Sequence, residues 1–400
     1  MDGSADLSIN LPAAGGRMER YRLLGPGRFV TATDPSQFNR VAYSAAHVVA
    51  DPVAAGNPWQ DCNVDWDATI AYRKHLWRLG MGVAEAMDTA QRGMGMDWNA
   101  SFELIRRSVD AAKDIPGALL ASGCGTDQLA PGDARNLDDV IRAYETQMAA
   151  IEGCGGKLIV MASRELARIA KSPADYEKVY DRILRQARQP IIIHWLGDAF
   201  DPALKNYWGS ADPKAAVDTA LGIIAAHPGK VDGIKISLLD DQIEIAMRRR
   251  LPPKVRMYTG DDFNFAPLIA GDGQGKLPNQ QYSDALLGIF DAIAPAASAA
   301  LLALAQGDQK KFDAILAPTV PLSRHIFKAP TWHYKTGVTF MAWLNGHQSH
   351  FTMVGGQQSA RSLPHLAELF RLADAAGLLM KPELAMQRMK ALLALHGVNP

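Results

Sequence analysis

Eight short apolar segments recur along the chain and alternate with stretches that have the period of an amphipathic helix. One such stretch begins at Ser172-Pro173, an N-cap followed by a first-turn proline. Strands joined by crossover helices form parallel sheets, and eight of them predict an α/β protein with a closed (β/α)8 barrel. The alternative is an open doubly wound sheet, but no GxGxxG loop follows the first segment. The predicted strands are 46–50, 82–87, 118–124, 157–161, 190–195, 231–236, 255–259 and 285–290.

The chain is predicted to have three parts: an N-terminal extension (1–40), the barrel (41–305) and a C-terminal helical region (306–400). Within the extension, residues 20–24 and 28–31 are expected to pair as a hairpin around a Gly-Pro-Gly turn. Apolar stripes at helical spacing continue after the last strand. They predict helices at 294–307, 309–316, 336–345, 363–376 and 382–395.

Composition excludes several classes of function. The 42 Lys and Arg residues balance 42 Asp and Glu residues, which argues against nucleic acid or an anionic membrane as the partner. The longest apolar runs are too short to cross a bilayer. The three cysteines form no CxxC pair, which argues against a disulfide framework or a cysteine zinc site. The start of the chain lacks a signal peptide, so a cytoplasmic location is expected.

Lys235 is the most informative residue, because it lies inside the apolar segment VDGIKIS (231–237). A lysine in such a strand either extends to the strand edge or is buried with a lowered pKa. A neutral buried amine can attack a ketone to form an imine. The alternative is an edge lysine that pairs with Asp240 or Asp241.

VDGIKIS resembles the sixth strand of the dihydrodipicolinate synthase and N-acetylneuraminate lyase superfamily, class I aldolases in which this lysine forms the Schiff base. The segments 118–125, 259–262 and 285–295 resemble that family's third, seventh and eighth strands, in order. The resemblance spans roughly residues 41–380 and is that of a divergent branch. It implies a lyase or aldolase that acts on a 2-oxo acid or a sugar-derived carbonyl compound by C–C cleavage, condensation or dehydration. It further implies no cofactor and a homodimer or homotetramer.

The chain departs from that family's pattern at three places. The GTTGE motif after the second strand becomes residues 87–91, MDTAQ, so Asp88 replaces a hydroxyl and only Thr89 carries over. The fourth-strand PYY motif, which contains the proton-relay tyrosine, becomes Ala162-Ser163-Arg164. The fifth-strand tyrosine becomes His194. An ionised Asp88 within about 4 Å would repel a substrate carboxylate by about 4 kcal/mol at an effective dielectric near 20. Either Asp88 is protonated or turned away, or the substrate presents hydroxyl groups to it; we favour the hydroxyl-bearing substrate.

Several other residues are candidates for the same site. His194 ends a strand, where barrel active sites lie, and is either a general acid or base or a core histidine. Arg164 either binds a carboxylate or phosphate or pairs with a neighbouring acid. Tyr258 and Tyr43 are substitute proton relays or packing residues. Gly260-Asp261 matches the family's seventh-strand motif and is expected to bind substrate.

Two alternative functions remain open at this stage. The first is a metal-dependent sugar isomerase or epimerase on the same barrel. The second is a catalytically silent barrel that binds a sugar-like ligand, since the relay tyrosine is lost. No HxH or HExxH spacing supports a metal site, and none is expected. The side chains that would serve as ligands are those of His47, His194, Asp198, Asp201, Asp261 and Asp262.

Overall fold

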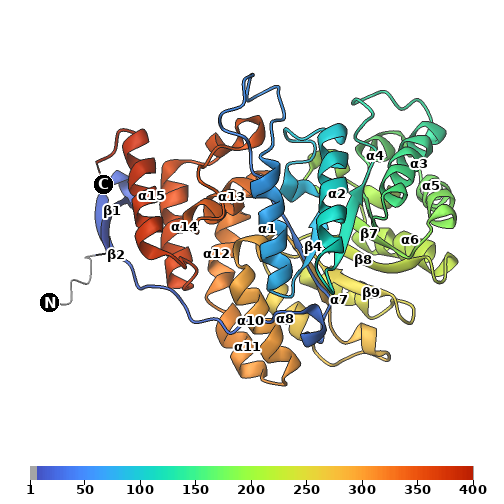
Figure 1. The fold of residues 1–400 in the computed structure, drawn as a ribbon. Coiled ribbons are helices and arrows are strands. Elements are labelled where there is room, and N and C mark those ends of the chain that lie inside the picture. The colour runs from blue at the N-terminus through green and yellow to red at the C-terminus, as the bar shows by residue number, and fades with distance from the viewer. Residues whose placement is uncertain (1–6, 400) are drawn as a thin grey trace.

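The computed structural model describes residues 7–399, and at its centre eight parallel strands close into one barrel (Figure 1). Each strand pairs with the next along the chain, and the last pairs with the first. The predicted (β/α)8 barrel is therefore confirmed. The strands are β3 (Ala42–Ala45), β4 (Gly82–Glu85), β5 (Leu120–Cys124), β6 (Leu158–Met161), β7 (Ile191–Leu196), β8 (Val231–Ser237), β9 (Arg256–Thr259) and β10 (Asp284–Leu287).

The first barrel strand lies earlier than predicted, at Ala42–Ala45 rather than at 46–50. Residues 46–50 are buried, as their composition indicates, but they form the loop that leaves the strand. The main-chain carbonyls of Ala46 and His47 there accept hydrogen bonds from the guanidinium of Arg73. An apolar run indicates that a segment is buried but not that it is a strand. A loop can be buried in the same way when a side chain donates hydrogen bonds to its carbonyls.

Helices surround the barrel and follow its strands, as the alternating pattern predicts. The helix that begins after Ser172 has a capping box, in which the Asp175 carboxylate accepts from the Ser172 amide. The surrounding helices are α1 (Trp66–Arg78), α2 (Trp98–Lys113), α3 (Leu137–Gly153), α4 (Arg164–Ile169), α5 (Pro173–Gln186), α6 (Pro213–Ala226), α7 (Asp241–Arg248) and α8 (Phe265–Ala270).

The C-terminal helices gather on one side of the barrel (Figure 1). One of them, α12 (Thr319–Ile326), was not predicted, because Pro321 interrupts its apolar pattern. A proline in the first turn of a helix is tolerated, since the amide it lacks has no partner within the helix. The others are α9 (Ile289–Ala292), α10 (Ala294–Ala305), α11 (Gln309–Leu316), α13 (Tyr334–Leu344), α14 (Leu363–Ala375) and α15 (Pro382–Leu395). No helix among the described residues is both long and apolar enough to span a bilayer.

The N-terminal hairpin forms from other residues than predicted. Strands β1 (Ser8–Pro12) and β2 (Met18–Arg22) pair antiparallel, and Gly15 and Gly16 supply positive φ angles of 75° and 76° at the turn between them. The predicted pairing of 20–24 with 28–31 is wrong. The chain that follows β2 is instead bonded to the C-terminal region, where the Asp374 carboxylate accepts from the Leu24 amide at 2.8 Å and the Gly377 carbonyl accepts from the Gly27 amide at 2.8 Å. A turn motif in the sequence cannot predict a hydrogen bond to a residue this far along the chain.

Candidate active site

Lys235 lies on the inside of the barrel, near the end of β8, with 4% of its surface exposed. Its Cα is paired in register with that of His194 on β7 and that of Tyr258 on β9. Gly260 follows β9 and leaves room for it, because a Cβ there would lie 2.7 Å from the Lys235 Cε and 2.2 Å from the Ser237 Oγ. The glycine of the seventh-strand motif therefore allows the lysine side chain to pass.

Burial lowers the pKa of the Lys235 ammonium, and the nearby carboxylates of Asp88 and Asp262 oppose that shift. Burial raises the pKa of Asp262 to about 8, even though its Oδ1 accepts a hydrogen bond from the Ile289 amide at 2.9 Å. A buried lysine and a buried carboxyl group thus face each other. Burial favours the neutral form of each group, and the attraction between their charges opposes this.

Asp88 lies in the short 3-10 turn Asp88–Ala90 that follows β4, and it meets a tyrosine from the start of α13. The Tyr334 hydroxyl donates to Asp88 Oδ2 at 2.7 Å and lies 2.7 Å from Thr89 Oγ1. A phenol has one proton to give, so the threonine hydroxyl donates to the tyrosine. The Lys335 ammonium lies 3.9 Å from the same carboxylate oxygen. Asp88 is therefore joined to two residues of the C-terminal region.

These contacts keep Asp88 ionised. Burial alone would raise the pKa of its carboxyl group, but the charges of Lys335 and Lys235 outweigh burial, and the pKa is lowered. Burial lowers the pKa of Lys335 to about 8. Burial and the negative charge of Asp88 raise the pKa of the Tyr334 phenol well above its usual value, so the hydroxyl stays protonated and able to donate.

A cavity of about 800 Å³ opens beside this cluster, and its lining includes Asp88, His194 and Lys335. Arg164 lines its wall, with half of the side chain exposed, and its Nε lies 2.5 Å from Asp201 Oδ2. The cavity is of the size that small-molecule sites in proteins have. Charged groups of both signs line it, so it suits a polar ligand.

His194 is buried and lines the cavity, with its Nε2 at 3.3 Å from the Ser237 hydroxyl oxygen. Burial and the charge of Lys235 lower the pKa of His194 well below its usual value. The imidazole is therefore neutral and has one N–H donor and one acceptor nitrogen. Its register next to Lys235 is that expected from the sequence.

Other candidates from the sequence lie elsewhere. The Tyr258 hydroxyl donates to Asp232 Oδ2 at 2.6 Å, and Asp232 is the second residue of β8, at the opposite end of the strand from the site. Tyr43 packs edge-on against the Tyr258 ring, at 6.1 Å between ring centroids. The Asp261 carboxylate accepts from the amides of Phe263 and Asn264, within its own loop. These three residues do not meet Lys235 at the cavity.

Sequence reasoning missed Tyr334 and Lys335 and counted Asp262 only as a metal ligand. A signal was present: the two residues begin a helix that is buried along its whole length, where a phenol and an ammonium require partners. Within residues 7–399, no group of three or more His, Cys, Asp or Glu side chains is arranged to hold a metal ion. His47, a proposed ligand, instead bonds through Nδ1 to the Asp291 carboxylate at 2.8 Å.

The closed barrel with its C-terminal helices is the fold of the dihydrodipicolinate synthases. The synthase from Aquifex aeolicus superposes with a TM-score of 0.61 at 13% identity, over 86% of this chain and 99% of that one. The synthase from Oceanobacillus iheyensis gives 0.58 at 14% identity, over 84% and 97%. The chloride-inhibited synthase from Acinetobacter baumannii, complexed with pyruvate, gives 0.58 at 15% identity, over 85% and 99%.

The resemblance predicted from the sequence is thus confirmed at the level of the fold. Residues 9–398 match the model of the family described as "Protein of unknown function (DUF993)", and the chain belongs to that family. No curated protein matches the chain.

Proposed function

We propose that this protein is a lyase or aldolase in which Lys235 forms a Schiff base with a small carbonyl compound. The observation that carries the proposal is the burial of Lys235 on the inside of the barrel, with a lowered pKa and in register with His194, which lines an open cavity together with Asp88. Burial favours the neutral form of this lysine, which is the form that acts as a nucleophile.

The chemistry follows from the groups around this lysine. The neutral amine adds to the carbonyl carbon, and the resulting carbinolamine takes up a proton and loses water to give an iminium ion. The iminium draws electrons from a bond at the adjacent carbon, so the substrate can lose a proton or break a C–C bond there. Asp262, whose pKa burial raises to about 8, is the partner that can exchange a proton with the Lys235 amine.

We further propose that Tyr334 relays protons in place of the tyrosine missing from the fourth strand. Its hydroxyl lies between Asp88 and Thr89, at 2.7 Å from each, so a proton can pass along this chain of hydrogen bonds. The relay would come from the C-terminal helix α13 and not from a barrel strand. His194 remains the second candidate for this role.

The substrate we propose is a carbonyl compound that carries hydroxyl groups, such as a sugar-derived ketone or 2-oxo acid. Asp88 is ionised in the cavity wall and can accept hydrogen bonds from substrate hydroxyls. Arg164, on the same cavity, is suited to an anionic group at the far end of the substrate. Assembly as a homodimer or homotetramer stays an expectation from the resemblance.

Borohydride trapping tests this proposal. The protein is incubated with a panel of 2-oxo acids and hydroxylated ketones, reduced, digested and analysed by mass spectrometry. We expect the mass of one reduced substrate on Lys235, and none in Lys235→Arg. The matched control is Lys335→Arg, because Lys335 is also buried and also has a lowered pKa. Trapping that survives in Lys235→Arg and is lost in Lys335→Arg would show that the imine forms on Lys335 and would overturn our assignment to Lys235.

A further inference from the structure

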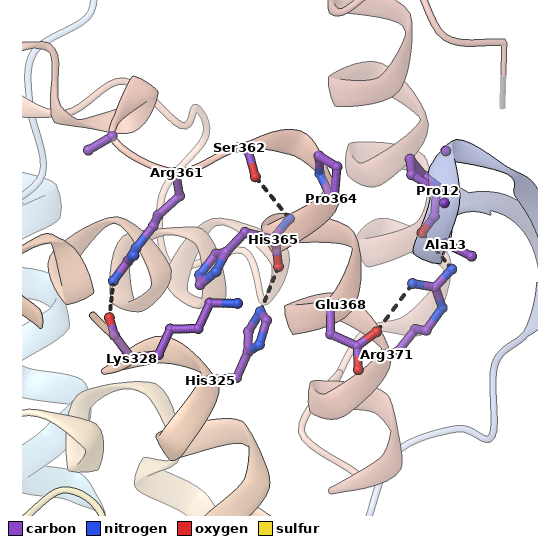
Figure 2. Close-up of a pocket in the computed structure, with 13 residues that line it drawn as sticks. Pro12, Ala13, His325, Lys328, Arg361, Ser362, Pro364, His365, Glu368 and Arg371 are labelled. Atoms are coloured by element: carbon purple, nitrogen blue, oxygen red, sulfur yellow. Dashed lines mark hydrogen bonds and ion pairs between the residues drawn. The ribbon is translucent and has the colours of Figure 1, made fainter. Parts of the chain in front are cut away.

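A second cavity, of about 660 Å³, lies between the N-terminal hairpin, the end of α12 and the start of α14 (Figure 2). It shares no lining residue with the cavity beside Lys235. Its charged and titratable groups come from the two helices and the loops that flank them, and the hairpin contributes none of them. Those groups are His325, Lys328, Arg361, His365, Glu368 and Arg371.

Cations outnumber acids in this cavity. Lys328, Arg361 and Arg371 face a single carboxylate, Glu368, which pairs with Arg371 at 3.4 Å. The Arg371 guanidinium is held in place by the carbonyl of Pro12 at 2.8 Å. Within the described part of the chain, no acceptor is bonded to the exposed Lys328 ammonium. The lining therefore has a net positive charge, with one cation free to bind a ligand.

Arg361 is similarly fixed. Its guanidinium donates to the carbonyls of Lys328 and Pro330, at 2.7 and 3.1 Å, while its buried Nε has no partner among the described residues. These bonds hold the arginine across the loop after α12, next to the cavity. A cation that is positioned by neutral carbonyls keeps its charge available to a ligand.

His365 is the independent observation that indicates a ligand. It lies in the first turn of α14, lines the cavity and is 6% exposed, and neither of its ring nitrogens has a hydrogen-bond partner within residues 7–399. Its ring stacks on that of His325, with centroids 4.2 Å apart. Burial, together with His325 and Arg361, lowers the pKa of His365 to about 3, so the ring is neutral and retains one N–H donor. A buried donor without an acceptor is costly.

We propose that this cavity binds the phosphate group of a small molecule. The 13-residue helix α14 begins at this cavity: its N-cap Ser362 lines the cavity, as do Pro364 and His365 of its first turn (Figure 2). Helix N-termini favour anions, and lysine and arginine are the side chains that bind phosphate. The cavity is larger than one phosphate group needs, so a phosphate ester fits better than the free ion. The site does not depend on the chemistry proposed for Lys235.

Isothermal titration calorimetry on the full chain tests the proposal, with sodium phosphate and glycerol 3-phosphate as probes and sodium chloride at matched ionic strength. We expect saturable binding of both phosphates. Lys328→Gln should weaken it about tenfold, because one hydrogen bond to a charged group is lost. Lys310→Gln on α11 is the matched control, since Lys310 is exposed and does not line the cavity. It should bind both probes as the wild type does.

The two probes also identify the source of the phosphate. Tighter binding of glycerol 3-phosphate supports an ester as the ligand, and equal affinity supports free phosphate. A second measurement follows the His325 and His365 ring protons by NMR during the titration, and their shifts should saturate with the calorimetric affinity. The proposal is overturned if no saturable binding occurs below about 10 mM, or if Lys328→Gln and wild type bind equally.

Discussion

Replacing Tyr334 by phenylalanine removes one hydroxyl from the candidate active site and leaves the packing of the ring in place. That hydroxyl donates to the ionised Asp88 carboxylate at 2.7 Å; Tyr334 is buried, and Asp88 is partly exposed and lines the cavity. A hydrogen bond to a charged group contributes about 1.5–3 kcal/mol. Its loss should raise the pKa of Asp88, because the bond stabilises the ionised carboxylate.

If Tyr334 relays protons, the same change should slow proton transfer by about 10²–10⁴-fold. The assay is exchange of the proton next to the carbonyl with deuterium from solvent, followed by NMR on a substrate that borohydride traps at Lys235. This exchange requires the imine and a group that carries the proton. The assay can therefore be run before the complete reaction is known. We expect Tyr334→Phe to form the imine with wild-type yield and to exchange slowly.

Tyr258→Phe is the matched control. Its hydroxyl also donates to an aspartate, Asp232 at 2.6 Å, but at the other end of β8. The two variants should lose comparable stability to urea, and only Tyr334→Phe should lose exchange. A loss of less than about tenfold in Tyr334→Phe, or an equal loss in both variants, would refute the relay.

Three further outcomes are expected. His194→Ala should slow the same exchange by about 10²–10⁴-fold with the imine retained, and a smaller loss would make His194 a structural residue. Asp88→Thr should improve trapping of pyruvate relative to hydroxylated ketones. If the wild type already traps pyruvate and Asp88→Thr traps it no better, the proposed hydroxylated substrate is wrong. Burial lowers the pKa of His347 and of His365 to about 3, below the usual 6.5, so the folded state binds fewer protons. Stability in urea should therefore fall as pH drops below about 6.5, by up to about 1.4 kcal/mol per pH unit for each histidine, and replacing either by glutamine should reduce that slope.

The sequence by itself determined the barrel and the position of its lysine. Apolar segments that alternate with amphipathic helices specify a parallel sheet, and VDGIKIS marks the strand on which Lys235 lies. Asp88 and Thr89 were singled out by the resemblance of residues 87–91 to a family motif that follows the second strand, and His194 by its position at the end of a strand. In all these cases the information is local: a strand's period and its order along the chain set the place of its residues.

Only the tertiary structure decided which side chains complete the site. Tyr334 bonds to Asp88 across 246 positions in sequence, a contact that depends on how α13 packs over the barrel. The sequence also could not predict the direction of a side chain. Tyr258 and Lys235 are paired in register, yet the tyrosine hydroxyl reaches the opposite end of β8. Local pattern specifies which residues are buried and in what order. The contacts between distant segments follow from the packing of side chains, which no local period encodes.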